Sequence, residues 1–170
     1  MEIAPFRGAR VRRPTRREIL EAYAVRSALE ALAARLAVPR MTDADLVELA
    51  GYLEAMRAAA REDDGPGVAE ADARFHGRIV DLADNGTLAR VWGSLEPFSR
   101  TYLTLVVPGA DPQWSADLHG PIVAALERRD SEAVVDALER HFDEVRDNMA
   151  QRWPDERPEV IDLDRTQRQA

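Results

Sequence analysis

Apolar side chains recur at helical spacing through most of this 170-residue chain. One such stripe comprises Val134, Leu138, Phe142, Val145 and Met149, which share one face of a helix with a period of 3.6 residues. The alternation of apolar and polar residues that is typical of a strand is confined to about residues 9–13. The sequence therefore predicts an all-α fold, an antiparallel bundle of six or seven helices.

Helix-capping residues and breakers divide these stripes. Thr15 with Glu18, and Thr42 with Asp45, have the spacing of a side chain that caps a helix three residues ahead. Pro39 ends the first helix, and Asp111 precedes a proline at the start of the fifth. The helices are expected at about residues 15–38, 42–61, 68–83, 88–106, 112–128 and 131–152.

All three histidines of the chain fall on apolar stripes of separate predicted helices. Asp72 precedes His76 by four residues, so both side chains project from one helical face. His119 and His141 each lie eleven residues from Asp130, the turn of a predicted helical hairpin. At about 1.5 Å per residue, both rings lie about 16 Å from the turn and so face each other.

Three buried imidazoles and a carboxylate are a suitable ligand set for a divalent ion such as zinc or nickel, with coordination positions left open. The alternative is a set of core histidines satisfied by hydrogen bonds, within a purely structural bundle that binds no ion. A metal-dependent enzyme that acts on a small organic acid is a third hypothesis. The sequence has no further histidine for a general base and no H-E-x-x-H motif, which argues against an enzyme.

Composition and charge limit the class of protein. The hydrophobic content of 45% is enough for one sizeable core, and no apolar stretch is long enough to span a membrane. Without cysteines or a signal-peptide pattern, the expected location is cytoplasmic. Residues 1–17 hold six arginines and one glutamate, net +5, and the remainder carries −13. The body should therefore repel nucleic acid, whereas the basic strip is either a phosphate contact or a solvated leader.

Several segments resemble the C-terminal effector-binding and oligomerisation domain, called FCD, of GntR-type bacterial transcription regulators of the FadR subfamily. The segments that carry the resemblance are R-x-x-L-E at residues 26–30, D-x-x-x-H at residues 72–76, Asn85, the H-G-P-I of residues 119–122, and His141.

The resemblance implies a helical bundle in which Asp72, His76, His119 and His141 bind a divalent metal, zinc or nickel or else manganese. It also implies a small carboxylate effector bound by the metal, with Arg26 and Asn85 as effector-binding residues, and a homodimer. Two alternatives stay open: Arg26 and Glu30 also have the spacing of a surface ion pair, and Asn85 also suits a turn. Effector binding would pull the first helix toward the metal site, as a ligand-gated switch.

The same resemblance divides the chain into three parts. Residues 1–14 are similar to the last wing strand and linker of a winged helix-turn-helix domain, residues 15–153 form the FCD domain, and residues 154–170 form a polar tail expected to be disordered. DNA binding is then expected only through a winged helix-turn-helix domain absent from this chain. The chain is accordingly either a truncated regulator or a stand-alone effector domain.

Overall fold

The structure, a computed structural model, describes residues 2–3, 9–12, 15–101, 111–152 and 160–161. Its body is a helical bundle, which confirms the predicted all-α class. The helices are α1 (Arg16–Ala37), the 3-10 turn η1 (Val38–Arg40), α2 (Asp43–Arg61), α3 (Gly65–Leu82), α4 (Gly86–Thr101), α5 (Pro112–Asp117), α6 (Gly120–Glu127) and α7 (Ser131–Arg152).

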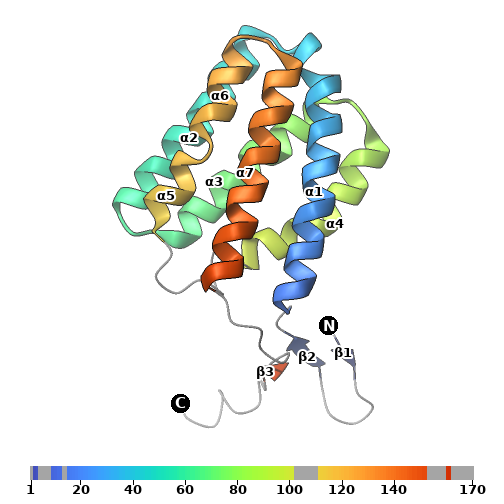
Figure 1. Ribbon diagram of the computed structural model, residues 1–170, viewed down its shortest axis with the longest axis vertical. Helices are drawn as coiled ribbons and strands as arrows, with labels where there is room; N and C mark the ends of the chain where they lie inside the picture. Colours follow the sequence, from blue (N-terminus) through green and yellow to red (C-terminus); the bar gives the residue numbers. More distant parts are fainter. Residues whose placement is uncertain (1, 4–8, 13–14, 102–110, 153–159, 162–170) are drawn as a thin grey trace.

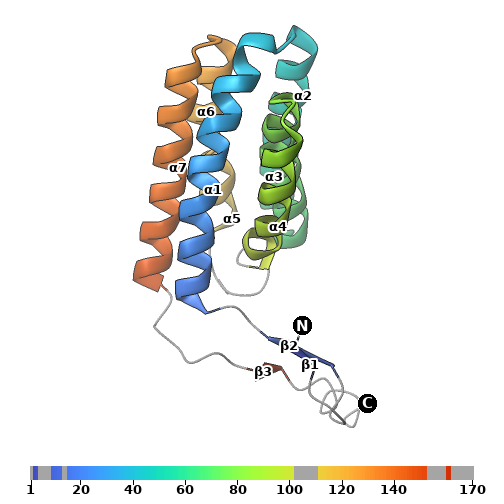
Figure 2. The same ribbon diagram turned by 90° about the vertical axis from the view of Figure 1, so that its right-hand side faces the viewer.

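The two longest helices, α1 and α7, lie side by side along the bundle, with α6 and α5 beside α7 and α4 beside α1 (Figure 1). In Figure 2, α1 and α7 form one layer and α2, α3 and α4 form the layer that faces them. The core between the layers includes Phe75, Ile79, Ile122, Leu138 and Phe142, all almost fully buried. Among the described residues, every helix is too short or too polar to cross a membrane.

Both predicted capping boxes are present. The Thr15 hydroxyl accepts from the backbone N–H of Glu18, and the Glu18 carboxylate accepts from the backbone N–H of Thr15. Thr42 and Asp45 make the same reciprocal pair at the start of α2. These pairs satisfy backbone donors that have no partner within a helix, which is why α1 and α2 begin where the sequence predicts.

Helix α3 begins at Gly65, three residues before the predicted start. The Asp64 carboxylate accepts from the backbone N–H of Gly67 and so caps the helix. A Cβ atom at Gly67 would collide with the side chain of Asp64. The glycine therefore allows the cap to form inside a stretch that resembles a loop in sequence.

The predicted fifth helix is two helices in the structure, and this is a correction to the expectation. α5 ends at Asp117 and α6 begins at Gly120, with His119 at the N-cap of α6. Pro121 has no N–H to continue the α5 ladder, and it disfavours helical geometry at the residue before it. His119 therefore lies at a break rather than on a continuous apolar stripe.

Two other expectations concern the ends of the chain and the end of the fourth helix. Strand β2 (Ala9–Arg12) pairs antiparallel with β1 (Glu2–Ile3) and with β3 (Val160–Ile161), in the order β1-β2-β3. β2 matches the strand expected at residues 9–13, and β3 lies within the tail predicted to be disordered. The remainder of that tail, and residues 102–106 of the predicted fourth helix, lie outside the described residues.

Candidate metal centre

Asp72, His76, His119 and His141 come together in the interior of the bundle, from α3, from the start of α6 and from α7. One ligand nitrogen from each of the three histidines lies within 4.8 Å of the other two. The rings of His119 and His141 have their centroids 4.6 Å apart, as the predicted hairpin requires. All four side chains are buried.

The separations between the ligand atoms of Asp72, His76 and His119 suit a common ion. His76 Nε2 lies 3.1 Å from His119 Nε2, and Asp72 Oδ1 lies 3.2 Å from His119 Nε2 and 3.8 Å from His76 Nε2. Zinc–nitrogen bonds of about 2.1 Å place neighbouring ligand atoms about 3.0 Å apart at a right angle and about 3.4 Å apart in a tetrahedron. Two of the observed separations, 3.1 and 3.2 Å, lie within this range, and the third, 3.8 Å, lies slightly above it.

In His76 and His119, the hydrogen bond made by Nδ1 determines whether Nε2, the nitrogen that faces the other ligands, carries a proton or a free lone pair. His119 Nδ1 lies 3.1 Å from the carbonyl oxygen of Ser115, and His76 Nδ1 lies 2.5 Å from the Glu30 carboxylate. Both partners only accept hydrogen bonds, so each Nδ1 carries the proton. In the neutral rings, both Nε2 lone pairs then face each other beside the Asp72 carboxylate, and only a cation or an added proton relieves their repulsion.

This arrangement is the one that metal-binding histidines usually have. A histidine ligand generally donates its other ring N–H to a carboxylate or a backbone carbonyl, which orients the ring. His141 adds a further observation, because its Nδ1 is buried and has no hydrogen-bond partner in the structure. A buried nitrogen without a partner is costly unless a ligand or an ion satisfies it.

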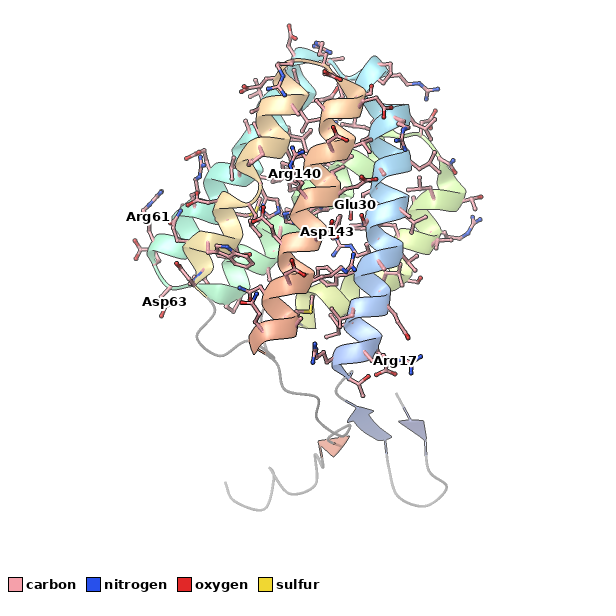
Figure 3. The ribbon with its side chains drawn as sticks, in the orientation of Figure 1. Arg17, Glu30, Arg61, Asp63, Arg140 and Asp143 are labelled. Atoms are coloured by element: carbon pink, nitrogen blue, oxygen red, sulfur yellow. The ribbon has the colours of Figure 1, made fainter. Side chains whose placement is uncertain are left out.

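Glu30 is not among the site residues predicted from the sequence. Its carboxylate is fully buried and accepts hydrogen bonds from Arg26, from His76 and from the indole nitrogen of Trp92 on α4. Figure 3 shows Glu30 in the interior between the ribbons of α1 and α7, whereas Arg17 and Arg61 lie at the periphery. The R-x-x-L-E segment is the only signal for Glu30 in the sequence, and its spacing equally suits an exposed pair.

Arg26 is buried beside the ligand set rather than on the surface. Its guanidinium donates to Glu30 through Nε and Nη2, at 3.2 and 3.0 Å. The aromatic rings of Tyr23, Trp92 and Phe142 lie 5.2–5.7 Å from its Cζ atom. The i,i+4 pair expected from the sequence therefore exists, but in the core, where its charges interact far more strongly than in water.

The neighbouring charges keep the acidic groups ionised. Burial alone would raise the pKa of Asp72, but a hydrogen bond from His119 and the positive charges of His76, His119 and Arg26 hold it far below the ordinary value; the histidine contributions apply when those rings carry an added proton. Burial would also raise the pKa of Glu30, but the charge of His76, when it is protonated, and the charge of Arg26 outweigh this effect and lower that pKa. Burial lowers the pKa of His141, and an added proton on His119 or His76 would lower it further, so this ring is neutral, as a metal ligand must be.

The second predicted effector residue, Asn85, lies outside this cluster. It follows the end of α3 at Leu82, which lies six residues or about 9 Å along the helix axis beyond His76. Its Oδ1 accepts from the backbone N–H groups of Thr87 and Leu88 at the start of α4. Asn85 thus has the turn and capping role that the sequence left open as the alternative.

A cavity of about 300 Å³ lies beside His141, between α7 and the pair α5 and α6. This volume is at the lower end of the range for small-molecule sites. Its lining comprises Trp114, Asp117, Leu118, Pro121, Ala137, Arg140, His141 and Glu144. His141, whose ring is buried, is the only member of the candidate metal centre among these lining residues.

Comparisons with known proteins agree on one type of domain. A family model described as the FCD domain matches residues 21–144. A probable D-xylose utilization operon transcriptional repressor from Paenarthrobacter nicotinovorans is 36% identical over 134 residues, which are 79% of this chain and 59% of the relative. The gluconate operon transcriptional repressor of Bacillus subtilis is 24% identical, over 82% of this chain and 60% of its own length.

A solved structure has the same fold. E. coli McbR/YncC matches with a TM-score of 0.72 at 22% identity, over 81% of this chain and 70% of that one. The chain thus spans about 60% of the length of the two curated relatives.

Proposed function

Since the chain belongs to the FCD domain family of GntR-type transcription regulators, we propose that it is the ligand-sensing and dimerisation domain of such a regulator. It is a regulatory domain and not an enzyme, and the relatives are named as transcriptional repressors. In the proposal, Asp72, His76, His119 and His141 hold a divalent metal ion, and a small carboxylate binds beside it.

One observation carries the metal proposal: buried acceptor atoms from α3 and α6 converge without a donor between them. His76 Nε2, His119 Nε2 and Asp72 Oδ1 lie 3.1–3.8 Å apart, and the outer nitrogens of both rings are committed to acceptors. Nitrogen ligands with one carboxylate favour zinc or nickel, and manganese is a third candidate. The ion would supply a positive charge with open positions for an anion.

The effector is proposed to be a small carboxylate, such as a sugar acid. One curated relative is named for the gluconate operon, and gluconate is a sugar acid, whereas the other is named for the utilization of D-xylose, a neutral sugar. Arg26 is a buried cation whose charge acts on Asp72, so it would attract a second carboxylate that enters the site. Asn85 remains a proposed effector contact only because the sequence resembles the family at this position. In the structure, its side-chain oxygen caps α4.

The proposed switch uses the connection between the site and α1. Arg26 and Glu30 belong to α1, and this helix follows directly after the segment that contains β2. A ligand that pairs with Arg26 would therefore favour one position of α1 over another. In a complete regulator, that bias would move DNA-binding domains relative to their half-sites in the cytoplasm.

A homodimer is proposed on the face made by α1 and α4. Val25 and Leu32 of α1 and Val91 of α4 are 44–47% exposed, although they are large and apolar. Val25 and Leu32 are seven residues apart, so they share one side of α1. A second copy that covers this face would remove the apolar surface from water.

The test is metal analysis of the purified protein. The wild-type chain should bind zinc stoichiometrically, and the His119→Ala/His141→Ala double variant should not. An ion at 100 times its Kd stabilises a fold by about 2.7 kcal/mol. For a chain of this size, chelation should then lower Tm by about 5–11 °C. Stoichiometric zinc in the double variant, or a wild-type Tm insensitive to chelation, would rule out the proposed site.

A further inference from the structure

Glu30 joins three helices at one buried carboxylate, because its partners lie on α1, α3 and α4. We infer that Glu30 is a positioning residue for His76: it holds the ring proton on Nδ1 and so keeps Nε2 free to bind the metal. The inference rests on the proposed metal site for its effect on affinity. The position of the ring proton is a property of the metal-free protein and can be tested separately.

The two oxygens of Glu30 have different partners. Oε1 accepts from Arg26 Nε at 3.2 Å, from Arg26 Nη2 at 3.0 Å and from Trp92 Nε1 at 2.7 Å. Oε2 contacts only His76 Nδ1 among the hydrogen bonds of the described residues, at 2.5 Å. Arginine and tryptophan can only donate, so the Oε1 position requires an acceptor. The Oε2 position determines the tautomer of His76.

An isosteric amide at residue 30 separates these two roles. In Glu30→Gln, the amide oxygen must remain toward the three donors from Arg26 and Trp92. The amide NH₂ then lies against His76 Nδ1, which can pair with it only as an acceptor. The ring proton moves to Nε2, the nitrogen that lies 3.1 Å from His119 Nε2. Glutamine therefore keeps the volume of Glu30 but blocks a metal ligand with a proton.

This role explains why a carboxylate is buried at this point. An unpaired charge in the core is costly, and Arg26 offsets the charge of Glu30 at Oε1, the oxygen that does not contact His76. Trp92 on α4 also donates a hydrogen bond to Oε1 of Glu30. The carboxylate therefore cannot rotate away from His76 without losing this hydrogen bond. Arg26 and Trp92 orient Glu30, and Glu30 orients His76.

The first measurement is made on the metal-free wild-type protein, with histidine labelled with ¹⁵N, at a pH where the rings are neutral. Long-range ¹H–¹⁵N spectra distinguish the two tautomers, and His119→Ala and His141→Ala assign the three rings. His76 should carry its proton on Nδ1 in the wild type and on Nε2 in Glu30→Gln. A wild-type His76 protonated on Nε2 would overturn the inference without any variant at residue 30.

The second measurement is zinc affinity by competition with a chelator. Glu30→Gln should bind zinc about 10–100-fold more weakly, the usual effect of losing such a partner. Glu132→Gln, the same change in an exposed pair with Arg35, should alter neither affinity nor tautomer. Trp92→Phe, which removes one donor but keeps the carboxylate, should retain the Nδ1 tautomer.

The outcomes separate the two proposals. If the wild type binds no zinc but the tautomer changes as described, the metal proposal fails and the positioning role of Glu30 stands. If Glu30→Gln keeps the wild-type tautomer, or binds zinc as tightly as the wild type does, the inference is wrong.

Discussion

Replacing Arg26 with methionine should destabilise the bundle strongly, because it breaks an ion pair that water does not reach. Arg26 and Glu30 are 1% and 0% exposed, and their charged groups lie 3.0 Å apart. Removing one partner of a buried pair costs about 3–5 kcal/mol, since the other charge is left uncompensated. Glu30 keeps its bonds from His76 and Trp92, so the expected loss is at the lower end, about 3 kcal/mol.

Arg35→Met is the matched control on the same helix. Arg35 pairs with Glu132 at a similar distance, 3.1 Å, but the two side chains are 48% and 70% exposed. Exposed pairs contribute about 0–1 kcal/mol, because water and salt screen them. The two variants delete the same guanidinium, but from a buried pair within α1 in one case and from an exposed pair between α1 and α7 in the other.

Urea unfolding followed by circular dichroism measures both variants. Chelator in all samples removes any contribution from metal, and equal protein concentrations remove differences in association. The expected 3 kcal/mol for Arg26→Met corresponds to a Tm lower by about 6–12 °C. If Arg26→Met loses no more stability than Arg35→Met, the buried pair is not what holds Glu30, and the account of this network is wrong.

Two further predictions concern residues outside the network. Asn85→Ala should lower the free energy of unfolding by about 0.5–2 kcal/mol, the usual contribution of an N-cap residue, and should leave the zinc content unchanged. An unchanged stability would show that the cap of α4 contributes nothing. Leu32→Glu should convert the dimer to a monomer, as measured by light scattering. Val47→Glu on α2, where the valine is 73% exposed, should leave the dimer intact. If the Leu32→Glu variant is still a dimer, the face made by α1 and α4 is not the interface.

Local structure follows from the sequence where neighbouring residues supply the necessary atoms. The caps at Thr15 and Thr42 need only a hydroxyl and a carboxylate three residues apart, so both are predictable. The break at His119 is less apparent, because an apolar stripe continues across it. The effect of Pro121 on the backbone outweighs that stripe, and α5 and α6 separate.

The candidate ligands illustrate the same distinction at longer range. Asp72 and His76 share a helical face by spacing alone, and the hairpin geometry predicts that His119 and His141 meet. The role of Glu30 has no such local origin. Whether an Arg–Glu pair faces water or the core depends on how α1 is rotated against α3, α4 and α7, and one helix alone does not determine this.

The amino-acid sequence by itself determined the helical class, most helix starts and the four acidic and imidazole side chains that meet, because periodicity, capping and hairpin length act within or between adjacent segments. Only the tertiary structure decided that Arg26 and Glu30 are buried and that Trp92 completes their network. Burial and long-range hydrogen bonds depend on packing between segments far apart in the chain, and this packing is a property of the whole bundle.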